Sequence, residues 1–461
     1  MQHYLSPLLK PQSVALVGAS DQAGSLGRTV FENLLAGQYK GTIYAVNSNR
    51  RRVFGRRAYA SIGAIGKPID LAVIATPAAA IPDILSEARA QMRTAVLMSF
   101  PDAGDLAGNS TWQRKVAAIG KKRGIRLLGP GALGVIRTDL GLNATFCAPM
   151  ALPGRLALVA QSGAVCTAML DFAGPMQMGF STVTSLGGNI DIGFGELLDA
   201  LVQDPATDAI LLYVESVGDA RAFLSALRGA ARTKPVVVLK AGRTSMGARA
   251  ASSHTGALAG NDKIYEDVLK QSGVIRARSL RDLLEYARAI PVLPTPKGEN
   301  VVIITGAGGS GVLLSDACVD NGLQLMAMPP DLDAAFRKFI PPFGAAGNPV
   351  DITGGEPPKT YQNTIRLGLE DARIHSLILG YWHTIITPPM VFAKLVVEVV
   401  EEMKAKGIQK PIVASLAGDV EVEEAAEYLF DHGIPAYPYS TEMPVNVLGA
   451  KYKWARGAGA I

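Results

Sequence analysis

The sequence predicts an α/β fold built from parallel sheets, and three observations support this. Short, continuously apolar runs recur along the 461 residues, as is typical of strands that are buried on both faces. Each run ends in a Gly-rich or polar turn and is followed by a helical pattern, which indicates strand–helix–strand units. The chain has 49 Gly but only 13 Phe and 3 Trp, a composition that suits many tight strand-to-helix turns.

The predicted strands fall into three sets, so we expect three α/β modules, which also suits a chain too long for one ordinary core. The sets are separated by ALPG at 151–154 and by PVLPTPKGEN at 291–300, which has the composition of a linker. We therefore expect domains over 1–150, 151–290 and 297–461. The predicted strands, with the turns that end them, lie at 13–20, 42–47, 70–77, 94–100, 125–130, 155–163, 181–188, 209–216, 235–242, 301–311, 323–328, 376–382 and 411–418.

Composition excludes several classes of protein. Apolar residues make up 48% and charged residues 18%, which excludes a disordered chain. A net charge of +5 is small for this length and argues against a nucleic-acid partner. The three scattered cysteines favour neither a zinc site nor a disulfide framework, and no apolar run reaches the roughly 18 residues of a membrane span. We expect a soluble, cytoplasmic protein with no metal site and no membrane partner.

A glycine-rich turn follows the first predicted strand, in VGASDQAGSLG at 17–27. Glycines there let backbone N–H groups approach a phosphate at the start of a helix. The second strand ends in AVNSNRRR, so Asn47 and arginines such as Arg50 stand where a dehydrogenase has an acidic residue for the ribose. A ligand with an extra phosphate near its ribose fits better, which leaves CoA or NADP, and a tight turn without a ligand is the alternative.

Two side chains are candidates for phosphoryl chemistry. His254 lies in RAASSHTGALAG, a run of small residues that suits a loop carrying a modified side chain, and a neutral imidazole is a competent nucleophile. Glu215 ends an apolar strand in AILLYVES, where a carboxylate could fix the imidazole tautomer. A capping or salt-bridging role for Glu215 is equally compatible with the sequence.

Two similar turns complete the pattern. LVAQSGAV and ITGAGGSGV each run from a strand through a Gly/Ser turn into a helix, at Gln161-Ser162-Gly163 and at Gly308–Gly311. Two helix amino ends directed at one anion would hold a dianionic phosphoryl group. Trp382-His383, at another strand end, could line a substrate pocket, although an aromatic residue there more often packs in the core.

Together these segments resemble the alpha subunit of NDP-forming acyl-CoA synthetases, a group that includes ADP-forming acetate–CoA ligases and is related to succinyl-CoA synthetase. The resemblance covers the whole chain in matching order: VGASDQAGSLG and GPGALGV, then QSGAV, YVES and SHTGALAG, then GAGGSGV and GNPVDITGG. It implies an N-terminal CoA-binding Rossmann-like domain followed by two flavodoxin-like ligase domains.

The resemblance also implies roles for individual residues. The phosphorylated histidine corresponds to His254 and its supporting glutamate to Glu215. The turns that grip the phosphoryl group correspond to Ser162-Gly163 and to Gly309-Ser310-Gly311. The expected CoA contacts are Gly18, Ser20, Gly24, Ser25, Gly27, Asn47, Arg50, Thr76 and Pro77.

The implied reaction makes acyl-CoA from a carboxylic acid, CoA and ATP, through an acyl phosphate and a phosphohistidine. ATP or ADP and Mg²⁺ are expected on a separate ATP-grasp beta subunit, in an α2β2-type assembly. Gly131 and Ala132 replace the usual Asn and Cys of the GPN-C motif, and SFPDAG at 99–104 replaces a Ser-x-Gly-Phe turn, so acyl preference is open. The alternatives are a non-catalytic CoA or acyl-CoA sensor and an NADP-dependent oxidoreductase.

Overall fold

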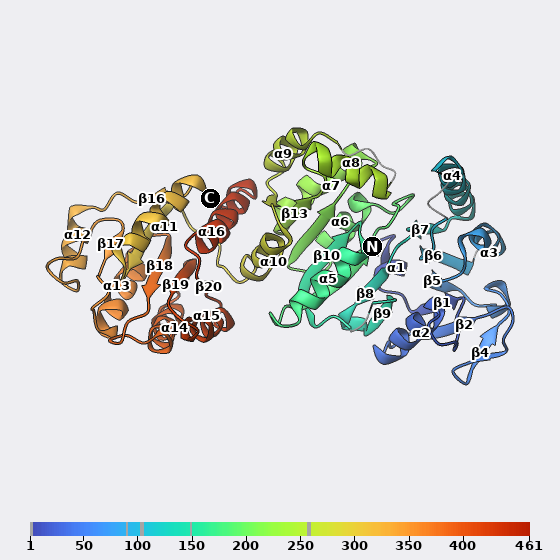
Figure 1. Ribbon diagram of the computed structural model, residues 1–461, viewed down its shortest axis with the longest axis horizontal. Coiled ribbons are helices and arrows are strands. Elements are labelled where there is room, and N and C mark those ends of the chain that lie inside the picture. The colour runs from blue at the N-terminus through green and yellow to red at the C-terminus, as the bar shows by residue number, and fades with distance from the viewer. Residues whose placement is uncertain (1–2, 89–90, 102–105, 148–149, 256–259) are drawn as a thin grey trace. The chain divides into compact units, whose positions relative to one another are not determined.

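The computed structural model describes residues 3–88, 91–101, 106–147, 150–255 and 260–461, with the backbone alone at 106–107 and 252–255. The chain divides into two compact units, Met1–Ala287 (unit 1) and Arg288–Ile461 (unit 2). The described residues form three largely parallel sheets, two in unit 1 and one in unit 2 (Figure 1). The predicted α/β class is therefore confirmed, whereas the domain boundaries at 150 and 297 stay a prediction.

The first sheet of unit 1 has the strand order β3-β4-β2-β1-β5-β6-β7, and its pairs are parallel except for the antiparallel hairpin β3–β4. Its strands are β1 (Ser13–Val17), β2 (Thr42–Val46), β3 (Arg52–Val53), β4 (Arg56–Tyr59), β5 (Ile69–Ile74), β6 (Met92–Leu97) and β7 (Arg126–Leu128). Its helices are α1 (Ser6–Leu9), α2 (Leu26–Ala36), α3 (Ile81–Glu87) and α4 (Leu106–Arg123).

The second sheet has the order β14-β13-β12-β10-β11-β8-β9, in which β8 and β9 form an antiparallel edge. These two strands precede residue 150 but belong to this sheet. Its strands are β8 (Gly134–Arg137), β9 (Leu142–Thr145), β10 (Pro153–Ala160), β11 (Phe180–Ser185), β12 (Ala209–Val214), β13 (Val236–Lys240) and β14 (Ile275–Ala277). Its helices are α5 (Gly163–Ala173), α6 (Phe194–Val202), α7 (Ala220–Thr233), α8 (Ser245–Thr255), α9 (Asp262–Gln271) and α10 (Leu280–Ala289).

The sheet of unit 2 is entirely parallel, with the order β16-β15-β18-β19-β20 and with β17 paired to the end of β15. Helices α13, α14 and α15 pack side by side, and α11 pairs with α16 (Figure 1). Its strands are β15 (Asn300–Thr305), β16 (Gln324–Leu325), β17 (Val350–Asp351), β18 (Ser376–Trp382), β19 (Ile412–Ala417) and β20 (Ala436–Pro438). Its helices are α11 (Gly308–Asp320), α12 (Pro330–Arg337), α13 (Pro358–Glu370), α14 (Pro389–Ala405), α15 (Glu421–Asp431) and α16 (Glu442–Gly457).

The two sheets of unit 1 share one hydrophobic core. Leu16 and Val73 of the first sheet belong to the same buried cluster as Val159 and Leu212 of the second. Asn33 on α2 adds a polar tie, because its side-chain amide donates to the carbonyl oxygens of residues 145 and 147 at 2.8 and 2.9 Å. The two sheets therefore belong to one compact unit.

A buried ion pair lies in this unit. The Arg137 side chain is fully buried; its Nη1 is 2.6 Å from Oδ2 of Asp204, which also pairs with Lys10. Burial acts to raise the pKa of Asp204, but the hydrogen bonds from Arg137 and Lys10 outweigh it and hold that pKa below its usual value.

Within the described residues, no helix is both long and apolar enough to cross a membrane.

We expect Arg137→Met to destabilise unit 1 by about 3–5 kcal/mol, because it leaves the Asp204 charge buried without its main partner. The change should appear as a lower midpoint in urea unfolding of the full chain followed by circular dichroism. Because the pKa of Asp204 is lowered by folding, the difference between variant and wild type should be full at neutral pH and shrink below about pH 4.

Arg155→Met is the matched control, since Arg155 pairs with Asp208 at the exposed surface. Its unfolding midpoint should stay close to that of the wild type, as exposed pairs contribute little. Equal shifts in the two variants would contradict the role given to the buried pair.

Candidate functional site

The carboxyl edge of the first sheet carries the glycine-rich turn. The strand order reverses beside β1, which lies between β2 and β5, and such switch points are where open α/β sheets bind ligands. Gly18 has φ +91°, and a Cβ on Gly27 would lie 1.8 Å from the Gly18 carbonyl oxygen. Only glycine lets the start of α2 approach the turn this closely. Ser25 caps α2 by accepting from the N–H of Arg28 at 3.3 Å.

The other residues predicted for CoA gather around this turn. The Asn47 side chain donates to the carbonyl of Ala19 at 2.9 Å, and Arg50 pairs with Asp21. Ser20 Oγ accepts from the N–H of Gln22 at 3.0 Å, which tightens the turn. Gly24, with φ +75°, follows in the same turn.

The turn after β5 closes the other side of the switch point. A Cβ on Gly18 would lie 3.1 Å from Cγ2 of Thr76, so the turns after β1 and β5 are in contact. The Thr76 hydroxyl is buried and has no hydrogen-bond partner among the residues that the structure describes. Pro77 beside it is exposed, and Ser99 donates to the Thr76 carbonyl at 2.6 Å. An unpartnered hydroxyl at a switch point suits a polar ligand.

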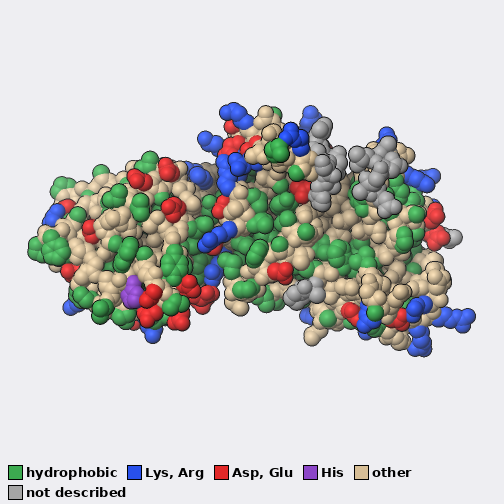
Figure 2. Space-filling model, viewed as in Figure 1, with side chains coloured by type: hydrophobic (Ala, Val, Ile, Leu, Met, Phe, Trp, Pro, Cys, Tyr) green, Lys and Arg blue, Asp and Glu red, His purple; other side chains and the backbone are tan. Residues whose placement is uncertain are grey.

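The arginine-rich segment forms the β3–β4 hairpin that follows β2. Arg57 lies over the Tyr59 ring at 4.7 Å, and Arg28 lies over the Phe54 ring at 5.6 Å. Figure 2 shows Lys and Arg side chains projecting from the part of unit 1 where Figure 1 places β4. This edge of the first sheet is therefore electropositive, which favours an anionic ligand.

The second sheet has its own switch point beside β10, which lies between β11 and β12. Ser162 caps α5 by accepting from the N–H of Val165 at 3.3 Å, and Gly163 is the first residue of that helix. Gln161 Oε1 accepts from the backbone N–H groups of Glu215 at 2.6 Å and of Ser216 at 2.9 Å. One glutamine side chain thus fixes the turn after β12 against the turn after β10.

Glu215 is buried, with 6% of its surface exposed, and has two titratable neighbours. Burial raises the pKa of Tyr213 to about 12, and the Glu215 carboxylate adds to this shift. Lys240, the last residue of β13, is also buried; burial lowers its pKa, whereas the charges of Asp262 and Glu215 act to raise it. Its ammonium lies 4.6 Å from the centre of the Tyr265 ring. The edge therefore gathers a carboxylate, a phenol and a buried lysine.

His254 lies near the end of α8, and its side chain is outside the described residues. The structure therefore gives no distance between the His254 imidazole and Glu215, and the role of His254 stays a prediction. A turn at Gly242, with φ +70°, connects the end of β13 to the start of α8.

In unit 2 the predicted turn forms the first turn of α11, a helix of 13 residues. Gly309 is exposed, Ser310 is half-buried and Gly311 is buried. Ala307, the N-cap residue, has no side-chain acceptor, so the first N–H groups of α11 lack a side-chain cap. Thr305 Oγ1 instead accepts from the N–H of Ala307 at 3.0 Å. This helix end can accept an anion.

A cavity of about 630 Å³ opens beside this helix end, at the switch point between β15 and β18. We call it the α11 cavity. One wall comes from the β15–α11 segment and consists of Gly306, Ala307, Gly309, Ser310 and Leu313. The other wall comes from four strand or loop ends and consists of Gly354, Trp382, Ala417 and Thr441. Trp382 thus lines a cavity, as the sequence allowed.

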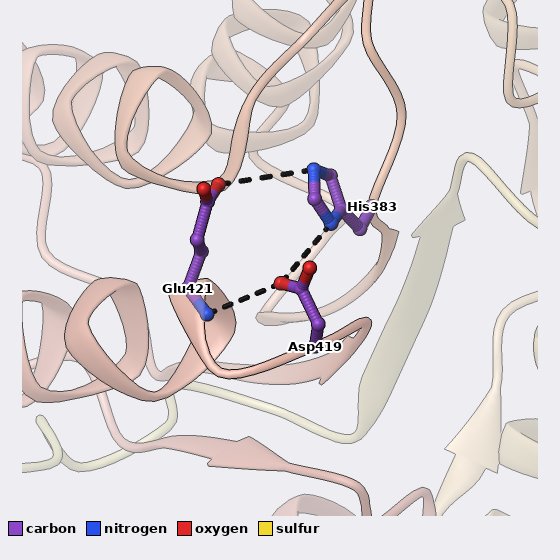
Figure 3. Close-up of side chains that lie close together, drawn as sticks. All are labelled: His383, Asp419 and Glu421. Atoms are coloured by element: carbon purple, nitrogen blue, oxygen red, sulfur yellow. Dashed lines mark hydrogen bonds and ion pairs between the residues drawn. The ribbon is translucent and has the colours of Figure 1, made fainter.

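His383 follows the lining residue Trp382 in the chain and forms a cluster with Asp419 and Glu421 (Figure 3). Nδ1 of His383 is 3.4 Å from Asp419, and Nε2 is 3.9 Å from Glu421. One ligand atom from each of the three side chains lies within 4.8 Å of the others, so the cluster could share a cation. Its contacts also join the segments that follow β18 and β19.

The GPGALG segment joins the two sheets of unit 1. The carbonyl of Pro130 accepts from the N–H of Gly188 at 2.7 Å, and Ala132 is completely buried. Gly131 has φ +68°, and a Cβ there would lie 3.4 Å from the Phe100 ring. Asparagine tolerates a positive φ better than most other side chains, so the backbone conformation at Gly131 is also compatible with the usual Asn.

Sequence reasoning missed three features of these edges. Lys240 ends the apolar run PVVVLK, and its position at a strand end was a signal that could have identified it. Asp351 lies beside the start of α11, where a Cβ on Gly308 would be 2.6 Å from its Oδ2. The α11 cavity is lined by five separate segments of the chain and therefore leaves no local sequence pattern.

The chain matches known families along most of its length. Residues 12–138 match a CoA binding domain, residues 153–290 match a succinyl-CoA ligase like flavodoxin domain, and residues 301–461 match a Ligase-CoA domain. A solved relative is the dinucleotide-forming acetyl-coenzyme A synthetase 1 of Ca. Korarchaeum cryptofilum in complex with phosphate and ADP. Its TM-score is 0.91 at 32% identity, with 99% of this chain and 97% of that chain covered.

Two curated relatives differ in length. The alpha subunit of ADP-forming acetate–CoA ligase I from Pyrococcus furiosus is 39% identical over 458 residues, which cover 98% of each chain. The ADP-forming 4-hydroxybutyrate–CoA ligase of Nitrosopumilus maritimus is 35% identical over 98% of this chain but only 64% of its own length. The chain belongs to the family of ADP-forming acetate–CoA ligases, within which it aligns with the alpha subunit.

Proposed function

We propose that this chain is the CoA-binding, histidine-carrying alpha subunit of an ADP-forming acyl-CoA synthetase. The observation that carries the proposal is the switch point of the second sheet, where Gln161 holds Glu215 beside the start of α5. This arrangement offers a buried carboxylate and a helix amino end to one phosphorylated side chain. The relative from Pyrococcus furiosus supports the same activity.

In the proposed reaction, His254 carries the phosphoryl group. A carboxylate oxygen of the acid attacks the phosphorus, the N–P bond breaks, and the imidazole recovers its electron pair. The CoA sulfur then attacks the acyl carbon, the C–O bond breaks, and phosphate leaves. ATP restores the phosphohistidine and becomes ADP. Glu215 holds the imidazole tautomer, and the phosphoryl group is bound at Ser162-Gly163 and at Gly309-Ser310-Gly311.

CoA is proposed to bind at the switch point of the first sheet. The turn from Gly18 to Gly27 and the start of α2 receive its pyrophosphate. The glycines have no side chains there, so a phosphate can approach the backbone N–H groups at this helix end. Asn47, Arg50 and the neighbouring arginines suit the ribose and its phosphate, and the unpartnered Thr76 hydroxyl, next to Pro77, offers a further contact. The lack of an acidic residue at the end of β2 favours this ligand over NAD.

The nucleotide and Mg²⁺ are proposed to bind a separate ATP-grasp beta subunit, in an α2β2-type assembly in the cytoplasm. The naming of the Pyrococcus furiosus relative as a subunit alpha supports a partner. The matched part is only 64% of the 4-hydroxybutyrate–CoA ligase, so that relative has further residues that this chain does not match.

Incubation of the purified full chain with phosphate and acyl-CoA should phosphorylate His254, since this is the synthesis run backwards. His254→Ala should abolish the label, and Glu215→Gln should slow its formation about 10- to 100-fold. Intact mass spectrometry with an acid-lability check measures the label. His432→Ala, at an exposed histidine of unit 2, should label like the wild type.

Persistent labelling of His254→Ala would contradict the proposal. CoA binding without any label in the wild type, even with a beta subunit present, would favour a non-catalytic sensor. A nicotinamide absorbance in the purified protein would favour the oxidoreductase.

Gln161→Met should loosen the turn that carries Glu215, because two N–H groups lose their acceptor, which costs about 1–3 kcal/mol. Hydrogen exchange at the amides of Glu215 and Ser216 should become about tenfold faster or more, and phosphorylation should slow with it. Gln161→Glu keeps an acceptor oxygen and should retain more of the amide protection.

Gln203→Met is the control, because the exposed Gln203 bonds only a helix carbonyl, that of Asp199 at 3.3 Å. Unchanged hydrogen exchange at residues 215 and 216 in Gln161→Met would show that the Gln161 side chain does not hold the turn that carries Glu215.

A further inference from the structure

Lys240 is the last residue of β13, and only 4% of its surface is exposed. It pairs in register with Val214, so it lies directly beside the turn that carries Glu215. Lysine is almost never buried without a partner for its charge, because the ammonium loses its hydration. An apolar residue would fill the end of this strand at a lower free-energy cost. The buried ammonium of Lys240 therefore needs an explanation other than packing.

The segment that carries His254 leaves the sheet directly after Lys240. The N–H of Ala241 donates to the Val214 carbonyl at 2.9 Å, and the Ala241 carbonyl accepts from the Lys240 ammonium. The chain then turns at Gly242, where φ is +70°, and enters α8. The Lys240 side chain is therefore bonded to the departing end of this segment.

The same segment returns at the start of α9, where it meets Tyr265. A Cβ on Gly260 would lie 2.9 Å from Cε2 of Tyr265, so a larger residue at this position would displace the ring. Asp262, in the first turn of α9, pairs with Arg276 of β14. The returning end of the segment is therefore packed against the Tyr265 ring and tied to the neighbouring strand.

Lys240 and Tyr265 connect these two ends. The Lys240 ammonium lies 4.6 Å from the centre of the Tyr265 ring, which is the geometry of a cation–π interaction, and such interactions are stronger away from water. The Tyr265 hydroxyl also faces the backbone N–H of Val217, two residues beyond Glu215. Burial raises the pKa of Tyr265, and this N–H acts to lower it. The pair therefore also contacts the turn after β12.

We propose that Lys240 and Tyr265 are positioning residues that set the place of His254 relative to Glu215. The inference rests on the proposed function, since it names further residues of that same site. One cation–π contact joins the strand end from which the His254 segment departs to the helix by which it returns. Because the Tyr265 hydroxyl also meets the turn after β12, the same contacts locate both ends of the segment and the carboxylate.

The test measures the rate at which phosphate and acetyl-CoA label His254 in the full chain, followed by intact mass. Lys240→Met removes the charge, and Tyr265→Leu removes the ring; each should lower the maximal rate about tenfold. The acetyl-CoA concentration for half the maximal rate should change less than about twofold, because neither residue lies at the switch point proposed for CoA. Lys240→Arg and Tyr265→Phe, which keep the cation and the ring, should stay within about threefold of the wild type.

The double variant Lys240→Met/Tyr265→Leu distinguishes one shared contact from two independent effects. If the two residues act as a unit, the double variant should label about as slowly as either single variant, whereas independent effects would slow it about a hundredfold. A hundredfold loss would overturn the inference, as would single variants that label like the wild type. Tyr265→Leu leaves every charge in place, so it keeps the test decisive if Lys240→Met does not fold.

Lys263→Met is the matched control, because Lys263 is an exposed lysine in the first turn of α9. It should label like the wild type. A loss equal to that of Lys240→Met would overturn the inference, since it would show that removal of any positive charge near α9 slows the reaction.

Hydrogen exchange separates this inference from the proposed function. If acetyl-CoA does not label the wild type, the result counts against the proposed function, and exchange in the full chain decides on the contact. Amides at 245–251 and 260–265 should exchange about tenfold faster in Lys240→Met and Tyr265→Leu, and Lys263→Met should match the wild type. Unchanged exchange in the first two variants overturns the inference.

Discussion

The reversal of strand order beside β1, β10 and β15, one strand in each sheet, is the constraint on which the rest of the molecule depends. In the first sheet β1 lies between β2 and β5, in the second β10 lies between β11 and β12, and in unit 2 β15 lies between β16 and β18. The helices that follow the two inner strands must leave toward opposite faces of the sheet, so a crevice opens between them. The glycine-rich turn, Glu215 and the α11 cavity each lie at one of these crevices.

The crevices differ in how they are kept open and in place. At the first, a positive φ at Gly18 and the absence of a side chain at Gly27 allow backbone to approach backbone. At the second, the side chain of Gln161 ties the two turns. The sheets that carry the first two crevices share one hydrophobic core. Glycine therefore allows two backbone segments to approach closely at the first crevice, and the amide side chain of Gln161 positions the two turns at the second.

The sequence predicted the parts of the molecule that depend on local patterns. Every predicted apolar run contains a strand, because a strand covered on both faces needs uninterrupted apolar residues. The edge strands β8 and β9 escaped prediction, since they are short, antiparallel and follow the GPGALG turn. Lys240 and the cavity walls around Trp382 were not predicted as parts of sites, because they acquire their neighbours only when the fold brings separate strand ends together. The side chain of His254 lies outside the described residues, so its contacts stay a prediction.

The sites also differ in what a substitution can change. The starts of α5 and α11 present backbone N–H groups, which most side-chain changes leave intact. The wall of the α11 cavity at Leu313, Trp382 and Ala417 is made of side chains, whose volume and shape change with a substitution. The shape of this cavity and the backbone geometry of the helix starts are thus physically separable, because one is set by side chains and the other by where strands end and helices begin.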